Sequence, residues 1–205
     1  MSLWSSAKRP SVLIVETDEI ATMSTYSEQH LMSGASKFSI DVVEHYTFQR
    51  RDTACLYWCC SLDFFSDNGK LLLRQLLGQI IRHPLGDLAN STLLYDGSPD
   101  ANPCCERLTA LLGLTLSRLL ERAPVVIVID SIQSYESGAV IDRNVRAVLN
   151  NLVEMAEEES KYPLKLLITS TWHFQPLREG AKITTTYKLP LKVKQDAWKN
   201  RKRSP

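Results

Sequence analysis

Short apolar runs alternate with amphipathic stretches along most of this chain. Five runs are rich in β-branched or aromatic side chains and have the length of strands: residues 11–15, 55–62, 124–130, 164–170 and 184–193. The run PVVIVID at 124–130 is almost entirely apolar, as central parallel strands are when helices cover both faces of their sheet. Pro190 interrupts the last run, which predicts an edge strand there because proline cannot donate to a sheet ladder.

Apolar residues recur at helical spacing between several of these runs. This spacing and the composition predict helices at residues 22–32, 70–83, 106–123 and 142–160. Asp67 or Asn68 is expected to cap the second helix, and His83-Pro84 to end it, because a residue before proline avoids the helical region. Residues 33–53 fit a helix or a strand, and residues 84–103 hold turn-forming clusters that predict a surface connection.

Alternation of strand and helix predicts a three-layer α/β fold, a mostly parallel sheet with helices on both faces. The 205 residues suit one such domain. Ligands of these sheets bind past the carboxyl ends of strands. Candidate chemistry is therefore expected after Val15, Leu62, Asp130 and Ser170.

Composition narrows the class of protein but not its ligand. Hydrophobic residues make up 44% of the chain, charged residues 23%, and the formal net charge is +1, so overall charge selects neither nucleic acid nor an acidic partner. We expect a cytoplasmic protein, since no apolar run is long enough to span a bilayer and no signal-peptide cleavage site appears. The basic end WKNRKRSP is expected to be a solvated tail, with nuclear import or nucleic-acid contact as the alternative.

Cysteine and histidine spacing predicts no metal site. The odd count of five cysteines and the lack of Cys-x-x-Cys argue against a disulfide framework or a zinc ribbon. Cys55, Cys59 and Cys60 are expected to fill a buried strand as small apolar residues, with metal binding or redox chemistry as the alternative. The histidines lack the paired spacing of metal ligands: His30, His45, His83 and His173.

One long segment resembles a known family. LYWCCSLDFFSDNGKLLLRQLLGQIIRHP, residues 56–84, is similar to the segment after the first helix in fungal STAND or NACHT-type P-loop ATPases, above all in their nephrocystin 3-like N-terminal domain. That family has an aromatic strand, a polar loop and a helix of the form LLRSLLxQL. Further along the chain, VVIVIDSIQS stands where the family has its Walker B strand, and LKLLITSTWHF where it has a sensor strand.

The resemblance implies a P-loop NTPase-like fold with a STAND/AAA-type core, truncated relative to the family. Residues 11–193 would form a degenerate NACHT or nephrocystin 3-like N-terminal domain. Residues 1–10 would be an N-terminal extension, and residues 194–205 a basic C-terminal tail. Family members continue into helical and repeat regions, so we expect this chain to be a fragment or a shortened form.

The segment that matches the family's phosphate-binding loop lacks that loop's chemistry. In the frame Gly-x-x-x-x-Gly-Lys-Ser/Thr, residues 15–22 place Val15 and Ile20 at the two glycines and Ala21 at the lysine. Asp18, at a further family glycine, and Glu19 add negative charge where a polyphosphate would lie. Thr22 alone fits, as the residue that would bind Mg²⁺; its simpler interpretation is an ordinary helix-start residue.

Two further functional positions of the family, in the Walker B and sensor segments, also lack their charged groups in this chain. Asp130 remains at the end of the Walker B-like strand, but Gln133 and Ser134 stand where the family has Asp-Glu, and Thr171 stands where it has the sensor arginine. The simpler interpretation of Asp130 is a cap for the next turn. The pair Gly69-Lys70 does not fit the loop frame, and Lys70 is expected to be a solvated first-turn residue.

These losses predict a non-catalytic pseudo-NTPase module, or a fragment of a STAND/NACHT-type signalling protein, that acts through protein–protein contacts. We expect no ATP hydrolysis, no cofactor, no catalytic residue and no bound metal, with Thr22 and Asp130 as a vestigial nucleotide site. The first alternative is a divergent ATP-binding switch or ATPase that holds Mg-ATP with Thr22 and Asp130. The second is weak nucleic-acid binding through the basic tail. Protein partners, and oligomers of the kind that the family forms, are expected; a membrane is not.

Overall fold

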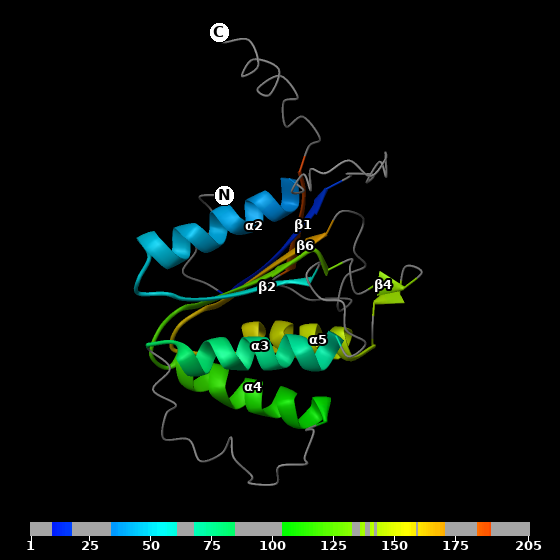
Figure 1. The fold of residues 1–205 in the computed structure, drawn as a ribbon. Helices are drawn as coiled ribbons and strands as arrows, with labels where there is room; N and C mark the ends of the chain where they lie inside the picture. The colour runs from blue at the N-terminus through cyan, green and yellow to red at the C-terminus, as the bar shows by residue number, and fades with distance from the viewer. Residues whose placement is uncertain are drawn as a thin grey trace.

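One all-parallel sheet forms the centre of the molecule. The computed structural model describes residues 10–17, 34–60, 68–84, 104–132, 136–137, 140–141, 143–158, 160–170 and 184–189. Within them the sheet strands are β1 Ser11–Thr17, β2 Ala54–Cys59, β3 Val125–Asp130, β6 Leu164–Ser170 and β7 Thr184–Leu189. They lie in the order β2-β3-β6-β1-β7 (Figure 1). All neighbours pair in parallel, so the carboxyl ends of all five strands meet at one edge.

Helices cover both faces of this sheet. The described helices are α2 Gly34–Glu44, α3 Asn68–Arg82, α4 Cys105–Leu120 and α5 Arg143–Glu157. Of these described helices, α2 lies on one side of the sheet, and α3, α4 and α5 lie on the other (Figure 1). There α3 and α5 contact the strands, while α4 packs mainly against α3 and α5 as an outer layer.

Side-chain alternation along the strands divides the core into two clusters. Ile127 and Leu166 face α3, α4 and α5, whereas Val128 and Leu167 face α2. Every residue of β3 and of β6 is buried. The continuous apolar runs of the sequence therefore have their expected cause, since helices exclude water from both sides of these strands.

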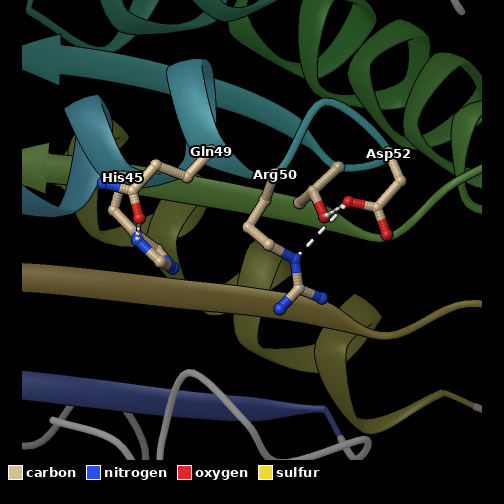
Figure 2. Close-up of polar contacts among 5 residues, drawn as sticks. His45, Gln49, Arg50 and Asp52 are labelled. Atoms are coloured by element: carbon tan, nitrogen blue, oxygen red, sulfur yellow. Dashed lines mark hydrogen bonds and ion pairs between the residues drawn. The ribbon is translucent and has the colours of Figure 1, made fainter.

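A π-helical turn, His45–Gln49, follows α2 and leads toward β2. Figure 2 shows its polar contacts: His45 Nδ1 lies 2.8 Å from Gln49 Oε1, and Arg50 Nε lies 3.5 Å from Asp52 Oδ1. The Thr53 amide donates to the Arg50 carbonyl at 3.0 Å, which closes the turn before β2 begins. Exposed ion pairs of this kind contribute about 0–1 kcal/mol, so their effect is mainly to shape the connection.

Most predicted elements are confirmed. The β3, β6 and β7 strands lie where the sequence predicts them, β7 is at the sheet edge and ends before Pro190, and α3 ends before His83-Pro84. The ambiguous stretch 33–53 contains α2, and the strand predicted at 55–62 is assigned to Ala54–Cys59. The predicted helix at 22–32 and nearly all of the connection at 84–103 lie outside the described residues.

A two-stranded antiparallel pair, β4 Glu136–Ser137 and β5 Val140–Ile141, was not predicted. Its strands have two residues each, which is too short for a period-two pattern to be recognised. Lys70 lies in the first turn of α3 as expected, but it is half-buried rather than fully solvated. None of the helices in the described ranges combines the length and the apolarity needed to cross a membrane.

Candidate functional site

Asp130, the last residue of β3, is fully buried and accepts four side-chain hydrogen bonds. Its Oδ1 accepts from Ser39 Oγ at 3.0 Å and from Thr169 Oγ1 at 2.5 Å. Its Oδ2 accepts from Ser131 Oγ at 3.2 Å and, more weakly, from Cys59 Sγ at 3.6 Å. An ionised carboxylate offers about four lone-pair sites, so these donors fill its capacity.

Strand pairing explains why these groups meet. Ile129 is the register partner of Ile168, so the next residues on the two strands, Asp130 and Thr169, lie side by side and face α2. On the other side, Cys59 is the register partner of Asp130. Ser39 completes the set from α2, which crosses above this part of the sheet.

Ser131 adopts a left-handed backbone conformation, with φ of 60°, directly after Asp130. This conformation costs a residue with a side chain about 1–2 kcal/mol. Hydrogen bonds offset that cost, because the Ser131 amide donates to Thr169 Oγ1 at 3.1 Å and the Ser131 hydroxyl reaches Asp130. The Ser131 hydroxyl also lies 3.3 Å from Ser36 Oγ at the start of α2. Asp130 therefore does more than cap the next turn, because its hydrogen bonds connect β3 to α2, β2 and β6.

The electrostatic surroundings favour neutral groups beside Asp130. Burial raises the pKa of Tyr57 above its ordinary value, and the Cys59 thiol and the charge of Asp130 raise it further. The Tyr57 phenol therefore keeps its proton. All four donors to Asp130 are uncharged side chains, and no lysine or arginine is among them.

Ser39 is a site residue that sequence reasoning missed. In P-loop NTPases, a loop Ser/Thr hydroxyl and the Walker B aspartate hold Mg²⁺ together. Here Ser39 brings the hydroxyl to Asp130. The available signal was Gly34 and Lys37 shortly before Ser39, but Ser36 precedes the lysine and Phe38 follows it, so the Gly-Lys-Ser/Thr frame is broken here too.

Several predicted site residues lie outside the described part of the chain: Asp18, Glu19, Ile20, Ala21, Thr22, Gln133, Ser134 and Thr171. Val15 is described, and it is buried in the core at the carboxyl-terminal half of β1. Only Asp130, of the two residues predicted for a vestigial nucleotide site, can therefore be placed.

The cysteines are free thiols in this structure. Cys60 is buried in the core, as the sequence predicts, and Cys55 lies against the apolar cluster under α2. Cys59 differs from the expected apolar filler because it donates to Asp130. Among the residues that the structure describes, no three His, Cys, Asp or Glu side chains form a group that could hold a metal ion.

Comparisons with known proteins identify the fold. No family model and no curated protein sequence matches the chain. The structure of Drosophila ORC bound to DNA superimposes with a TM-score of 0.51 and 14% identity, over 90% of this chain and 38% of that one. The chain has a P-loop NTPase-like α/β fold. The Aeropyrum pernix ORC2 protein in its ADPNP-ADP complexes matches with a TM-score of 0.40 and 16% identity, over 83% of this chain and 38% of that one.

Proposed function

We propose that this domain is a pseudo-NTPase, a P-loop NTPase-like module that does not hydrolyse ATP and acts through protein contacts. The observation that carries the proposal is the hydrogen bonding of Asp130. In a working site this carboxylate would face Mg²⁺ or its water shell, and the loop hydroxyl would bind the metal. Here the carboxylate accepts from Ser39, Thr169, Ser131 and Cys59, so the protein's own side chains take the metal's place.

The finer part of the proposal is a link to the STAND/NACHT signalling proteins of fungi. The aromatic strand β2, the LLRQLLGQI helix and the order of the later strands support it. The chain spans 38% of the ORC chain that it matches. Protein partners are part of the proposal because of the STAND/NACHT resemblance, and a cytoplasmic location remains the expectation from the sequence.

One alternative, an ATP-binding switch, has an observation in its favour. Ser39 and Asp130 form the hydroxyl–carboxylate pair that a P-loop NTPase uses for Mg²⁺, with 3.0 Å between their oxygens. In this alternative the metal breaks the Ser39–Asp130 hydrogen bond and both groups turn toward it, with Thr22 as a further hydroxyl. The absence of the loop lysine would weaken phosphate binding and remove much of the electrostatic catalysis.

Thermal unfolding with and without Mg-ATP separates the two functions. A ligand at 100 times its Kd stabilises a fold by about 2.7 kcal/mol, which is easily detected as a shift in Tm. We expect no shift with millimolar Mg-ATP or Mg-ADP compared with Mg²⁺ alone. Ser39→Ala and Asp130→Asn should lower Tm because they unpair buried groups, whereas Ser117→Ala on the exposed side of α4 should not.

A nucleotide-dependent rise in Tm would contradict the pseudo-NTPase proposal. If that rise also disappeared in Ser39→Ala and persisted in Ser117→Ala, the ATP-binding switch would be the function. A phosphate-release assay on the same samples then distinguishes a switch from an ATPase.

Nucleic-acid binding through the basic tail remains the second alternative, and its residues, 198–205, lie outside the described part of the chain. The Drosophila ORC structure contains DNA, but a likeness at 14% identity concerns the fold only. This alternative predicts binding to a DNA or RNA duplex that weakens steeply with salt and is lost when residues 198–205 are removed.

A further inference from the structure

The side chain of Gln79 lies against the outer edge of β2. Among the strands that the structure describes, β2 lies at one end of the sheet, with β3 as its neighbour on one side and no described strand on the other. On the other side, the Tyr57 amide donates to Gln79 Oε1 at 2.9 Å, and Gln79 Nε2 donates to the Tyr57 carbonyl at 2.7 Å. Both backbone groups of Tyr57 are therefore bonded to one carboxamide.

With these two bonds, the Gln79 carboxamide makes the hydrogen bonds to Tyr57 that a further strand beside β2 would make. In a β-strand the N–H and C=O of one residue point toward the same edge, and those of the next residue point toward the other. The two groups of Tyr57 point outward, where an added strand would bond them. The Gln79 side chain offers one acceptor and one donor, as a peptide group of that strand would.

Helix α3 holds the carboxamide in place. Leu76 and Ile80, which flank Gln79 on the helix, are fully buried in the core below the sheet. Their packing sets the rotation of the helix and directs residue 79 toward the flank of β2. The position of the Gln79 carboxamide is therefore set by the packing of α3 in the main core.

We infer that Gln79 closes the β2 edge of the sheet against strand addition by a second chain. An uncovered edge strand presents a row of unpaired N–H and C=O groups that another strand can join. Tyr57 lies between Cys55 and Cys59, the other two residues of β2 whose backbone groups point outward. An incoming strand must bond the middle position to form a continuous ladder, and Gln79 occupies it. This inference does not depend on the nucleotide chemistry of the site.

The test uses the 205-residue chain with Gln79→Leu and a matched control, Gln75→Leu, which makes the same change at an exposed position one turn earlier on α3. Sedimentation velocity over a range of concentrations measures self-association, and NMR hydrogen exchange measures protection of the Tyr57 amide. Gln79→Leu should self-associate with rising concentration, and its Tyr57 amide should exchange about tenfold faster at low concentration. Gln75→Leu should resemble the wild type in both measurements.

Gln79→Asn provides a second variant in case the leucine prevents folding. It keeps the amide and adds no apolar surface, but it is one methylene too short to reach both groups of Tyr57. It should also expose the edge and self-associate. Variants at position 79 that fold and stay monomeric at all concentrations would overturn the inference, even if Tyr57 exchanged faster. Equal self-association of Gln75→Leu would overturn it as well.

Discussion

Residues on one strand face of this domain have very different surroundings. Cys55 and Cys59 both lie on β2 and point toward the α2 side, four residues apart. Cys59 donates to the buried carboxylate of Asp130, whereas Cys55 lies against an apolar cluster with Tyr46 and Val126. Burial raises the pKa of Cys55 to about 11 from an ordinary 9.0, although a hydrogen bond with Thr47 partly opposes the shift.

We predict that Cys55 makes the fold less stable in alkali. Between pH 9 and about 11 the unfolded chain releases the Cys55 proton while the folded chain retains it, so the free energy of unfolding falls as pH rises. A two-unit shift corresponds to at most about 2.7 kcal/mol, and partial solvent access reduces this to about 1–2 kcal/mol. Urea unfolding at pH 8 and pH 10.5 should show a smaller loss for Cys55→Ala than for the wild type.

Cys104→Ala, at an exposed cysteine, is the control and should lose as much stability as the wild type. Tyr46 and Tyr57 also have raised pKa values, so all three proteins should weaken further above pH 10. If Cys55→Ala and the wild type lost the same free energy of unfolding between pH 8 and pH 10.5, the prediction for the Cys55 thiol would be wrong.

The packing of α3 against its neighbours explains one glycine and one glutamine of this helix, Gly69 and Gln79. A Cβ on Gly69 would lie 2.6 Å from the Asn144 Cβ and 3.1 Å from the Asn144 carbonyl carbon, so the helix can approach α5 only without a side chain there. Gln79, which matches the glutamine of the LLRSLLxQL pattern, bonds the edge of β2. The glycine of the Gly69-Lys70 pair therefore serves the packing of α3 against α5.

We predict opposite effects of alanine at glycines of α3 and α4. Gly69→Ala should destabilise the fold by about 1–3 kcal/mol, because atoms of the Asn144 backbone and Cβ must move. Gly78→Ala and Gly113→Ala meet no atom within 4 Å and lie inside helices, so each should stabilise the fold by about 0.5–1 kcal/mol. Chemical denaturation measures all three. A neutral Gly69→Ala would mean that α3 and α5 can separate at little cost.

In the part of the chain that the structure describes, the sheet lies between helix α2 on one face and the helices α3, α4 and α5 on the other. Every residue of the adjacent strands β3 and β6 is buried, and each of these strands has a partner on both sides. Strand β7 lies at the edge, and its residues Thr185, Thr186 and Tyr187 are exposed. Stability should therefore decrease from the middle of the sheet toward β7.

Hydrogen exchange read by mass spectrometry tests this gradient. Peptides covering β3 and β6 should exchange only on global unfolding, whereas the β7 peptide should exchange through local opening, at least about tenfold faster. Equal protection of β7 and β6 would contradict the gradient and would indicate that the edge strand opens only with the whole fold.

Local periodicity was enough to predict most elements from the sequence. The apolar runs of β3 and β6 and the leucine spacing of α3 and α4 report directly which side chains avoid water, and that information lies within a few neighbouring residues. The absence of a standard Gly-Lys-Ser/Thr loop is likewise a property of the residue types themselves. Asp130 could be named as a candidate because it ends the clearest strand.

Tertiary structure alone decided what these residues contact. The partners of Asp130 come from residues 39, 59, 131 and 169, which meet because of the order in which the parallel strands pair and because α2 crosses that edge. Tyr57 and Gln79 meet for a similar reason. Apolar burial is a local pattern that a sequence displays, whereas a hydrogen bond between distant residues depends on strand order and register, which a single sequence does not display.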